Sequence, residues 1–498
     1  MKMVKEFVQK YDKQVHRFLE IMPGTFSWSL ILFPVWGSFW IPHYVAYYII
    51  LFDIIWFYKS GALALSSLIA HLKLNASKKY DWLADVKRLP DQTRIHHLVI
   101  VPTYKEPLHT IERGLDSIVK QDFAKKQISV CLAFEDREGK DAKEKAKILT
   151  SKYKNIFANF IVTYHPDIAH EVKGKSSNEA YAGKIAKRLL VDKQKRDISY
   201  ITVTSKDADG ILDEKYLSAL GYKFLTTNAR HLVFWQPIIL YYNNIWRVPA
   251  PIRVMNSLGS VWQTALTARG DKLVNFSMYS LSLKLLHEVG YWDVDVIPED
   301  FRIFFKSYFA KNGKVEVEPI FLPVYADAAE STSYWKSLVN FYEQEKRWAW
   351  GVSDDAYFIK KWLTHTHIPF WQRTIRVFRV LADHFLWPVN WFAITLGATI
   401  PVILNPLFAQ TVMGQNLPRV SFGILTSCWV FLAIIIIIDL RQRPKREEQV
   451  SFLRRAISPF EYILMPVVTF IFSALPGIDA HTRLMLGKYL EYRVTEKV

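Results

Sequence analysis

Long apolar runs near both ends of the chain frame a middle segment of mixed polarity. Four of these runs approach or exceed the roughly 20 apolar residues that a membrane-spanning helix needs. They cover residues 25–42, 44–72, 386–404 and 422–440. A shorter run at 461–477 contains two prolines and is compatible with a spanning, a re-entrant or an interfacial helix. The pattern predicts two transmembrane helices on each side of the middle segment.

Lysine and arginine flank these runs unevenly, and this predicts their orientation. Basic residues precede the first run, are absent from the turn between the first two runs, and crowd the segment after residue 440. Because cytoplasmic flanks carry the excess of Lys and Arg, residues 73–385 are predicted to be cytoplasmic. The basic tail after 461–477 favours a fifth element that does not span. An integral protein of the plasma membrane is the default hypothesis.

Strand-like and helix-like patterns alternate in the first part of the middle segment. Runs rich in β-branched residues lie at 95–104, 127–136, 159–165 and 198–209, with helical patterns at 110–121 and 176–192. This alternation predicts an open, largely parallel α/β sheet. Ligands of such sheets bind beyond the carboxyl ends of the strands, where the polar residues that close each run would gather. The later part, dense in aromatic residues, is interpreted as a helical half that gathers substrate.

The composition narrows the classes of partner. The chain has 498 residues, 50% of them hydrophobic and 15% aromatic, and its formal net charge is +17. Such a charge suits nucleic acid, anionic lipid or a phosphorylated substrate. Since the basic residues gather beside the apolar runs, the charge mainly reflects membrane topology, and no motif supports a nucleic-acid partner. Cys131 and Cys428 lie in no metal-type spacing, which indicates a reducing compartment.

The segment ISYITVTSKDADG, residues 198–210, delivers Asp207 and Asp209 together at the end of a buried-type strand. A turn would explain the composition, because Asp and Gly favour loops. The alternative is a divalent cation between these carboxylates and a diphosphate, which would also relieve their mutual repulsion. Mg²⁺ or Mn²⁺ typically takes one or two carboxylates together with substrate phosphates.

Two further acidic pairs also allow both a local structural explanation and a functional one. Glu135 and Asp136, in FEDREG, end another strand and form either a solvated turn or an acceptor for a nucleobase N–H. Glu299 and Asp300, in IPEDF, follow a proline as acids do at helix N-termini. Asp300 is also a candidate general base that would take a proton from an acceptor hydroxyl.

The segment QEKRW places an amide, a guanidinium and an indole on one face of a helix, at Gln344, Arg347 and Trp348. A surface helix with a Glu343–Arg347 pair would explain the pattern. The functional alternative is a surface for a sugar and a phosphate, because Arg binds phosphate oxygens and Trp packs on sugar faces.

The order of these motifs resembles that of the membrane-embedded family 2 glycosyltransferases, which include cellulose, chitin and hyaluronan synthases. VPTYKEP, FEDREG, DAD, PED and QEKRW follow one another over residues 95–351, between the membrane segments. PTYKEP is similar to the opening P-T-Y-N-E-P of the cellulose synthase branch, with Lys105 in place of Asn. The resemblance implies a GT-A-type α/β domain that binds a nucleotide sugar, inserted between N- and C-terminal transmembrane helices.

The resemblance also implies an organisation of the whole chain. The cytoplasmic GT-A domain would cover 73–375. The other parts would be a cytoplasmic segment at 1–24, two transmembrane helices within 25–72, an interfacial helix and two transmembrane helices within 376–440, and a basic interfacial segment, a further membrane or re-entrant helix and a cytoplasmic tail within 441–498.

On the donor side, the resemblance implies contact of Asp136 with the nucleotide base, with Glu135 as its neighbour. Asp207 and Asp209 match D-x-D and would hold the metal, Mg²⁺ or Mn²⁺, and the donor diphosphate. Lys175, in KGKSSNEAYA, is similar to the K-A-x-x-L-N segment near the donor phosphates.

On the acceptor side, Asp300 matches the last residue of T-E-D, the catalytic base, with Glu299 beside it. Gln344, Arg347 and Trp348 match Q-x-x-R-W, which lines the acceptor end and the diphosphate.

Two segments test the limits of this resemblance. YRVTEK, residues 492–497, is similar to the F-x-V-T-x-K gating segment of cellulose synthases, so that Tyr492, Thr495 and Lys497 are candidate gating residues; chance similarity is the alternative. NFSMYSLSLKLL, residues 275–286, stands where synthases often read G-T-G-x-x-x-R-R. Because that segment would shape the acceptor pocket, the identity of the acceptor is the inference that transfers least from the resemblance.

The sequence therefore predicts an inverting glycosyltransferase that uses a nucleotide-diphosphate sugar, UDP-linked by preference, and extends a polysaccharide at the membrane. The alternative is transfer of a single sugar to a ceramide-type or polyprenyl-type lipid. A rival of another class is a transporter or membrane scaffold whose cytoplasmic domain merely binds a nucleotide sugar, which would give Asp300 and the QEKRW face no purpose.

Overall fold

The computed structural model of the chain describes residues 2–271, 273–446 and 458–491. The chain divides into two compact units. The helical unit consists of Met1–Ile69, Val248–Ala265 and Tyr334–Glu491, and the α/β unit contains Ala70–Arg247 and Leu266–Ser333. Two segments that the sequence places in one cytoplasmic domain over 73–375 thus belong to the helical unit.

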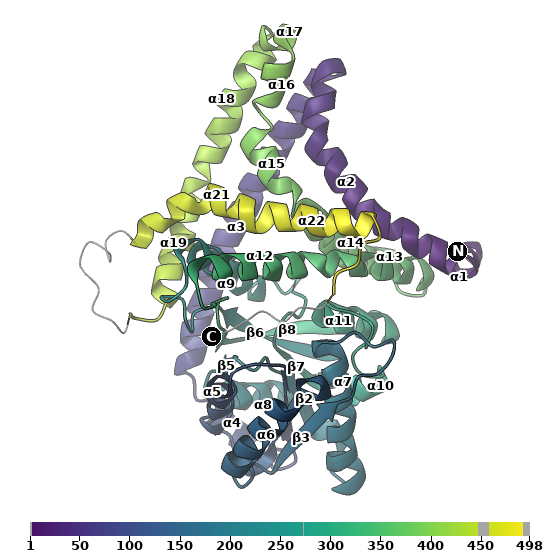
Figure 1. The fold of residues 1–498 in the computed structure, drawn as a ribbon, viewed down its shortest axis with the longest axis vertical. Helices are drawn as coiled ribbons and strands as arrows, with labels where there is room; N and C mark the ends of the chain where they lie inside the picture. The colour runs from purple at the N-terminus through teal and green to yellow at the C-terminus, as the bar shows by residue number, and fades with distance from the viewer. Residues whose placement is uncertain (1, 272, 447–457, 492–498) are drawn as a thin grey trace. The chain divides into compact units, whose positions relative to one another are not determined.

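The core of the α/β unit is one mixed sheet of eight strands in the order β3-β2-β1-β4-β7-β6-β8-β5 (Figure 1). The strands are β1 (His96–Thr103), β2 (Ile128–Glu135), β3 (Asn159–His165), β4 (Ile201–Ser205), β5 (Ile211–Leu212), β6 (Val233–Leu240), β7 (Tyr279–Ser282) and β8 (Glu316–Tyr325). The four strands β1 to β4 are mutually parallel, as the sequence predicts. Strand β7 runs antiparallel to β4 and β6, which makes the second half of the sheet mixed.

Burial explains why β1, β2 and β4 read as nearly continuous apolar runs. Every residue of these three strands is buried. Parallel strands covered on both faces lack the alternation of a half-exposed strand. One covering helix is α7 (Lys175–Lys187), which packs on β1, β2 and β3 through small buried residues such as Ala180, Ala182 and Gly183. These small side chains let the helix approach the sheet closely and bring its first residue to the carboxyl edge.

Further helices complete the α/β unit. They are α4 (Trp82–Arg88), α5 (Leu108–Val119), α6 (Lys140–Tyr153), α8 (Tyr216–Thr226), α10 (Leu283–Glu288) and α11 (Glu299–Ala310). Helices α5 and α7 confirm the helical patterns that the sequence shows at 110–121 and 176–192. Helix α11 begins at Glu299, directly after Pro298, as expected for a proline and acids at a helix start.

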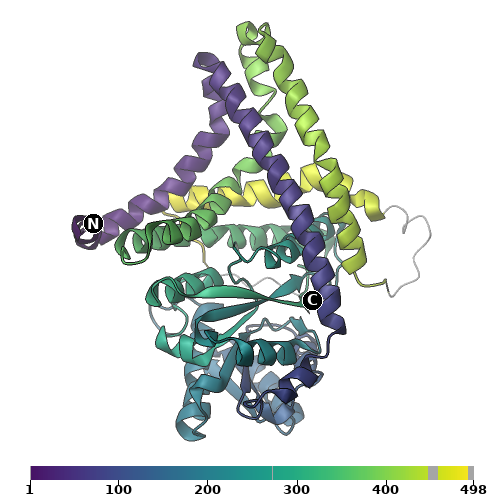
Figure 2. The same cartoon turned by 180° about the vertical axis from the view of Figure 1, so that it is seen from behind.

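The helical unit contains the apolar segments. Its helices are α1 (Lys2–Lys10), α2 (Asp12–Trp40), α3 (Pro42–Lys79, which continues into the α/β unit), α9 (Ala250–Thr267), α12 (Tyr334–Ala349), α13 (Asp355–Thr364), α14 (Phe370–Leu386), α15 (Val389–Leu396), α16 (Ile400–Leu404), α17 (Pro406–Ala409), α18 (Val412–Ser427), α19 (Trp429–Gln442), α21 (Met465–Thr469) and α22 (Leu475–Met485). Figure 2 shows α2 and α3 as long rods that meet at a turn, with α18 and α19 beside α3. Val45 and Ile49 of α3 pack with Leu417 in one buried cluster, and Ala64 packs with Ile435 in another.

Within the described residues, four helical segments are long and apolar enough to cross a membrane: Asp12–Trp40, Pro42–Lys79, Val412–Gln442 and Phe460–Met485. The predicted run 386–404 is not among them, and the expectation of one continuous helix there is wrong. The run divides into α15 and α16, with Gly397 and Pro401 at the break. Glycine costs helical stability and proline lacks the N–H that an α-helix needs, so apolar length alone does not make a helix.

The fifth run, which the sequence leaves open and tends to keep out of the membrane, is helical from Ser458 to Met485 with 3-10 and π turns. Its segment Phe460–Met485 meets the length and hydropathy of a spanning helix. In Figures 1 and 2 this segment runs crosswise to α3 and α18. Its composition therefore suits a spanning helix, whereas its direction relative to α3 and α18 suits a helix that lies along the membrane surface.

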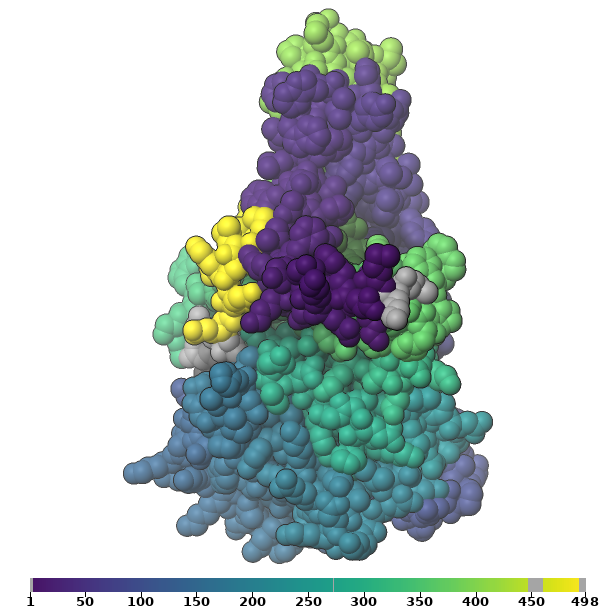
Figure 3. Space-filling model, turned by 90° about the vertical axis from the view of Figure 1, so that its right-hand side faces the viewer, coloured from purple at the N-terminus to yellow at the C-terminus, as the bar shows by residue number. Residues whose placement is uncertain are grey.

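The helical unit exposes many large apolar side chains. In Figure 3 the helices α1 and α2 form a continuous purple surface. Met3, Phe7, Phe18 and Trp40 of these helices are each more than half exposed. The long helices of the second half do the same, with Phe422 exposed by 73%. Proteins that are surrounded by water rarely expose apolar surface on this scale.

Candidate active site

Four acidic side chains surround one lysine at the carboxyl edge of the sheet. Lys175 opens α7, Asp207 follows β4, and Glu299 and Asp300 open α11. The Lys175 ammonium lies 2.9 Å from a carboxylate oxygen of Asp207 and 2.9 Å from one of Glu299. Glu179, one turn further along α7, is fully buried. The fold thus gathers five ionisable residues from three elements that are distant in sequence.

Burial and charge together set the protonation of this cluster. Burial raises the pKa of Glu299 to about 7 and that of Glu179 to about 8, although Lys175 opposes both shifts. Burial also raises the pKa of Asp300, opposed by the backbone N–H of Ser277 and by Lys175. For Lys175, burial lowers the pKa, but Asp207 and Glu299 outweigh it and the net pKa lies well above its usual value. Lys175 is therefore charged at neutral pH, whereas Glu179 and Glu299 titrate near it.

Asp300 is held in a defined position and stays partly exposed. Its carboxylate accepts hydrogen bonds from the Ser277 N–H, at 2.8 Å, and from the Phe301 N–H, at 2.8 Å. The Asn275 amide donates to the Asp300 carbonyl at 2.9 Å. A carboxylate that is fixed, reachable and raised in pKa has the attributes of a general base.

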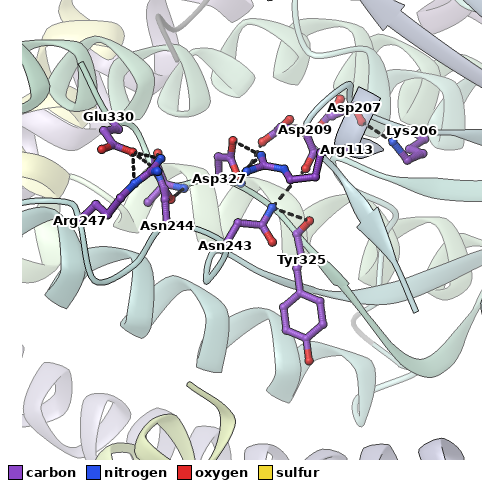
Figure 4. A network of polar contacts seen from close by, with 11 residues as sticks. Arg113, Lys206, Asp207, Asp209, Asn243, Asn244, Arg247, Tyr325, Asp327 and Glu330 are labelled. Carbon is purple, nitrogen blue, oxygen red and sulfur yellow. Dashed lines mark hydrogen bonds and ion pairs between the residues drawn. The ribbon is translucent and has the colours of Figure 1, made fainter. Parts of the chain in front are cut away.

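A second polar network supports the other end of the D-x-D segment, and Figure 4 shows its side chains. The Asp209 carboxylate is 2% exposed and accepts the backbone N–H of Asp327 at 2.9 Å. Arg113 of α5 donates to both carboxylate oxygens of Asp327, at 2.7 and 2.5 Å. The Asn243 amide donates to the Asp209 carbonyl at 3.2 Å. The network joins the ends of β4, β6 and β8 to α5.

The helix α5 approaches the turn between Asp207 and Asp209 very closely. A Cβ on Gly114 would lie 2.1 Å from the Ala208 carbonyl oxygen and 2.8 Å from the Lys206 ammonium nitrogen. Only glycine fits at this contact. Lys206 is fully buried and donates to the Asp207 carbonyl at 3.1 Å. A buried ammonium therefore lies against the backbone of the turn that carries the two aspartates.

The two aspartates differ in their fitness for a metal. The Asp207 carboxylate is 32% exposed, whereas the Asp209 carboxylate is buried against the Asp327 N–H. No group of three His, Cys, Asp or Glu side chains in the described part of the chain is arranged to hold a metal ion. One accessible carboxylate does suit Mg²⁺ or Mn²⁺ when diphosphate oxygens and water supply the other ligands. Asp207 fits that role, and Asp209 supports the turn.

Glu135 and Asp136, the two residues predicted to contact the nucleotide base, differ in exposure at the end of β2. Glu135 is buried and its carboxylate lies 2.6 Å from the Arg137 guanidinium, which packs on the Tyr104 ring at 3.8 Å. Asp136 is exposed. A small groove beside them is lined by Glu135, Arg137 and His165, among others. Asp136 is thus the residue of the pair that a ligand can reach.

The remaining predicted residues lie elsewhere in the chain. Gln344, Arg347 and Trp348 all belong to α12 of the helical unit, where Gln344 is buried and Trp348 is 37% exposed. Glu343 lies 2.8 Å from the Lys346 ammonium, and the suggested Glu343–Arg347 pair stays a prediction. The contribution of these residues to donor or acceptor binding stays a prediction. Tyr492, Thr495 and Lys497 lie outside the described residues.

Sequence reasoning missed several residues of the site. Ser277 and Glu179 contact or face the predicted residues, Asp327 contacts Asp209, and Arg113 holds Asp327, but the sequence assigned a role to none of these four. For Glu179 a signal existed, because an acid four residues after Lys175 lies on the same face of a helix. For the other three the partners are too far apart in sequence for any local pattern.

The Arg113 network makes a first testable prediction. Replacing Arg113 with methionine leaves the buried Asp327 carboxylate without its bidentate partner, so we expect a loss of about 1–3 kcal/mol of stability. The double variant Arg113→Met/Asp327→Asn should lose less than the sum of the single variants, because a neutral amide needs no counter-charge. Arg94→Met, which removes exposed pairs with Asp91 and Asp197, is the control with a small expected loss. Thermal unfolding measures all of these; strict additivity would contradict the coupling.

Comparison with known proteins adds an independent finding. Residues 203–438 match the family described as "Glycosyl transferase family group 2". This range contains Asp207, Asp209, Glu299, Asp300 and the QEKRW segment. No curated protein matches the sequence.

Solved structures of transferases show limited similarity. The mannosyltransferase PcManGT from Pyrobaculum calidifontis, in complex with GDP-Man and Mn²⁺, is 14% identical, with 80% of this chain and 100% of that chain covered and a TM-score of 0.45. S. aureus TarS 1–349 in complex with UDP-GlcNAc is 15% identical, with 80% of this chain and 93% of that chain covered and a TM-score of 0.35. The similarity that indicates an enzyme class is the match of residues 203–438 to the glycosyl transferase family group 2, which covers a little under half of the chain.

Proposed function

We propose that this glycosyltransferase is a membrane-bound, inverting enzyme of the GT-A type that moves a hexose from a nucleotide-diphosphate sugar, by preference a UDP-sugar, to a growing polysaccharide. The observation that carries the proposal is the cluster of Lys175, Asp207, Glu299 and Asp300 at the carboxyl edge of the sheet. Ligands of open α/β sheets bind at that edge. The cluster joins a phosphate-binding cation to a positioned base within one site.

In this proposal Asp300 deprotonates the acceptor hydroxyl. The acceptor oxygen attacks the anomeric carbon in line as the bond to the diphosphate breaks, which inverts the configuration. The proton remains on Asp300 and is then released to water. Since burial raises the pKa of Asp300, its carboxylate is a stronger base than an exposed aspartate, and the Ser277 and Phe301 N–H groups hold its oxygens in place.

The departing diphosphate needs positive charge. Lys175 is charged and reaches the same edge as Asp207, where it can shift from the carboxylates to phosphate oxygens. A bound Mg²⁺ or Mn²⁺ at Asp207 would supply further charge to the leaving group. Asp136, the exposed acid at the end of β2, suits a nucleobase N–H. Gln344, Arg347 and Trp348 are proposed to serve the acceptor and the diphosphate.

The membrane location rests on the helical unit. Four segments have the length and hydropathy of spanning helices, and their exposed apolar side chains require a nonpolar environment. The excess of basic residues beside these segments argues for a cytoplasmic catalytic site. We therefore infer an integral protein of the plasma membrane that takes its donor from the cytoplasm and contacts membrane lipid.

The acceptor has one alternative. Transfer of a single sugar to a ceramide-type or polyprenyl-type lipid would use the same donor site and the same base. A polysaccharide acceptor and a lipid acceptor both agree with the described contacts, because none of these contacts depends on the identity of the acceptor. Product size separates them: a ladder of oligomers supports the polysaccharide, whereas one lipid-soluble product supports the glycolipid.

The function is tested by donor turnover. We expect the detergent-solubilised full chain to release nucleoside diphosphate from one member of a panel of nucleotide sugars in the presence of Mn²⁺ or Mg²⁺. A chelator should remove this activity and added metal should restore it. Failure to turn over any donor, together with absence of metal-dependent donor binding, would contradict the proposal.

A further inference from the structure

Ser277 occupies the centre of the candidate site, although it is not among the predicted site residues. Its N–H donates to the Asp300 carboxylate at 2.8 Å, and its hydroxyl donates to the Asp207 carboxylate at 3.1 Å. Its carbonyl accepts from the Lys175 ammonium at 2.7 Å. One residue thus uses all three of its polar groups on three different residues of the site.

The backbone of Ser277 is in an unfavourable conformation. Its φ angle is +53°, in the left-handed region that favours glycine. Residues of other types keep such angles where the surrounding structure enforces them, and these positions cluster at active sites. A glycine would relieve the strain at Ser277, but it would also remove the hydroxyl that reaches Asp207.

The local structure explains how the conformation is enforced. Ser277 lies just before β7, between Phe276, whose N–H donates to the buried Gln236 side chain at 2.9 Å, and Met278, whose carbonyl accepts from the same side chain at 3.1 Å. The amide of Gln236 therefore clamps both neighbours. With its flanks fixed, Ser277 must turn its N–H toward α11 and its hydroxyl toward the end of β4.

We propose that Ser277 is a positioning residue that couples the donor-side carboxylate Asp207 to the base Asp300. This inference rests on the proposed function, which gives these two acids their roles. The hydroxyl sets the orientation of Asp207, and the N–H sets the orientation of Asp300. Because both bonds come from one strained residue, the relative placement of the metal-facing group and the base is fixed before the substrates arrive.

The coupling has a catalytic consequence. Proximity and orientation lower the barrier of a two-substrate reaction when the reacting groups are held in place. In this site the donor and the acceptor proton must meet acids from two separate elements, the end of β4 and the start of α11. Ser277 bonds directly to the acids of both elements, and the strain at its backbone is the cost of that link.

Three variants of the full chain test this role. Ser277→Ala removes the hydroxyl and keeps the strained backbone, and we expect the donor KM to rise about fivefold with kcat nearly unchanged. Ser277→Gly removes the hydroxyl and also the strain, and the greater backbone freedom of glycine holds the N–H less firmly toward Asp300. For this variant we expect a similar rise in KM and a fall in kcat of about tenfold or more. Its apparent melting temperature should equal or exceed that of the wild type.

Ser282→Ala is the matched control. Ser282 ends β7, caps α10 by accepting the Lys284 N–H at 3.2 Å, and contacts His231 at 2.8 Å, so its described side-chain contacts lie apart from the acids of the site. This change should lower the melting temperature and leave kcat and KM as in the wild type. A structural role for Ser277 would give the same pattern as Ser282, whereas a positioning role gives reduced turnover in a protein of undiminished stability.

The outcomes separate this inference from the proposed function. If the wild type turns over no donor, the proposed function fails and with it the roles of both acids. If the wild type is active and Ser277→Gly retains the kcat of the wild type, the coupling is refuted while the function stands. If Ser277→Gly loses turnover only in proportion to a loss of folded protein, Ser277 is structural and the inference is also refuted.

Discussion

Replacing Asp300 with asparagine is expected to reduce release of nucleoside diphosphate by about 10²–10⁴-fold, the range in which a general base contributes to catalysis. Asparagine has nearly the same shape but cannot take a proton at neutral pH. Its carbonyl oxygen can still accept one of the two N–H groups that hold Asp300, from Ser277 or Phe301. Donor binding should therefore persist, and titration of the intact variant with the donor and Mn²⁺ measures it.

Asp293→Asn is the control for this prediction. Asp293 precedes α11 and pairs with Arg302 at 2.7 Å and with Lys306 at 2.6 Å, so it has structural partners of its own. We expect a lower melting temperature and an unchanged kcat. Retained turnover in Asp300→Asn would exclude Asp300 as the base. Loss of donor binding in the same variant would place Asp300 in the donor site instead.

The elements that carry the candidate site show which features the sequence predicts well. Parallel strands end at one edge of a sheet, so recognising β1, β2, β3 and β4 from their patterns places the residues that close them, Asp136 and Asp207 among them, at that edge. The helix start at Glu299 follows from the chemistry of helix N-termini. These inferences succeed because local pattern decides them.

The contacts that hold the site residues in place could not be predicted from the sequence, because the partners are far apart along the chain. Ser277 is 23 residues from Asp300 and 70 from Asp207, and Arg113 is 214 residues from Asp327. No periodicity connects residues so far apart, and serine and arginine are common in solvated loops. The left-handed backbone of Ser277 is likewise imposed by its neighbours, because serine has no preference for that region.

Apolar length also failed to predict where the helices of the apolar segments end. The run at 386–404 has enough apolar residues to span, and yet it divides at Gly397 and Pro401 into α15 and α16. Phe460–Met485 contains prolines too and yet stays helical. Pro401, Pro466 and Pro476 all occupy the first turn of a helix, where a missing N–H costs least. A hydropathy window reports apolar length and therefore does not show where a helix ends.

Replacing Lys175 with methionine is expected to destabilise the α/β unit strongly. The change removes the ammonium that lies 2.9 Å from both Asp207 and Glu299 and leaves their charges without a counter-ion. Breaking a buried ion pair by removing one partner costs about 3–5 kcal/mol. We expect the apparent melting temperature of the detergent-solubilised chain to fall by roughly 10 °C at pH 8.

The loss in Lys175→Met should depend on pH, and its sign follows from the neighbouring acids. The pKa values of Glu179 and Glu299 are raised by burial to about 8 and about 7 even with Lys175 present, and removing the lysine raises them further. An acid whose pKa is higher in the folded state favours folding at low pH and disfavours it as the pH rises through the folded value. The deficit relative to the wild type should therefore be largest at pH 8 and shrink toward pH 5.5.

Two further variants decide whether charge is the cause. Lys173→Met removes an exposed lysine two residues away, whose pair with Asp167 is 54% exposed on both sides, and should cost less than about 1 kcal/mol at any pH. Adding Glu179→Gln to Lys175→Met should recover part of the stability at pH 8, because it removes one of the uncompensated carboxylates. A deficit that stays constant between pH 5.5 and pH 8, or a double variant no more stable than Lys175→Met alone, would mean that Lys175 stabilises the unit by packing and not by charge.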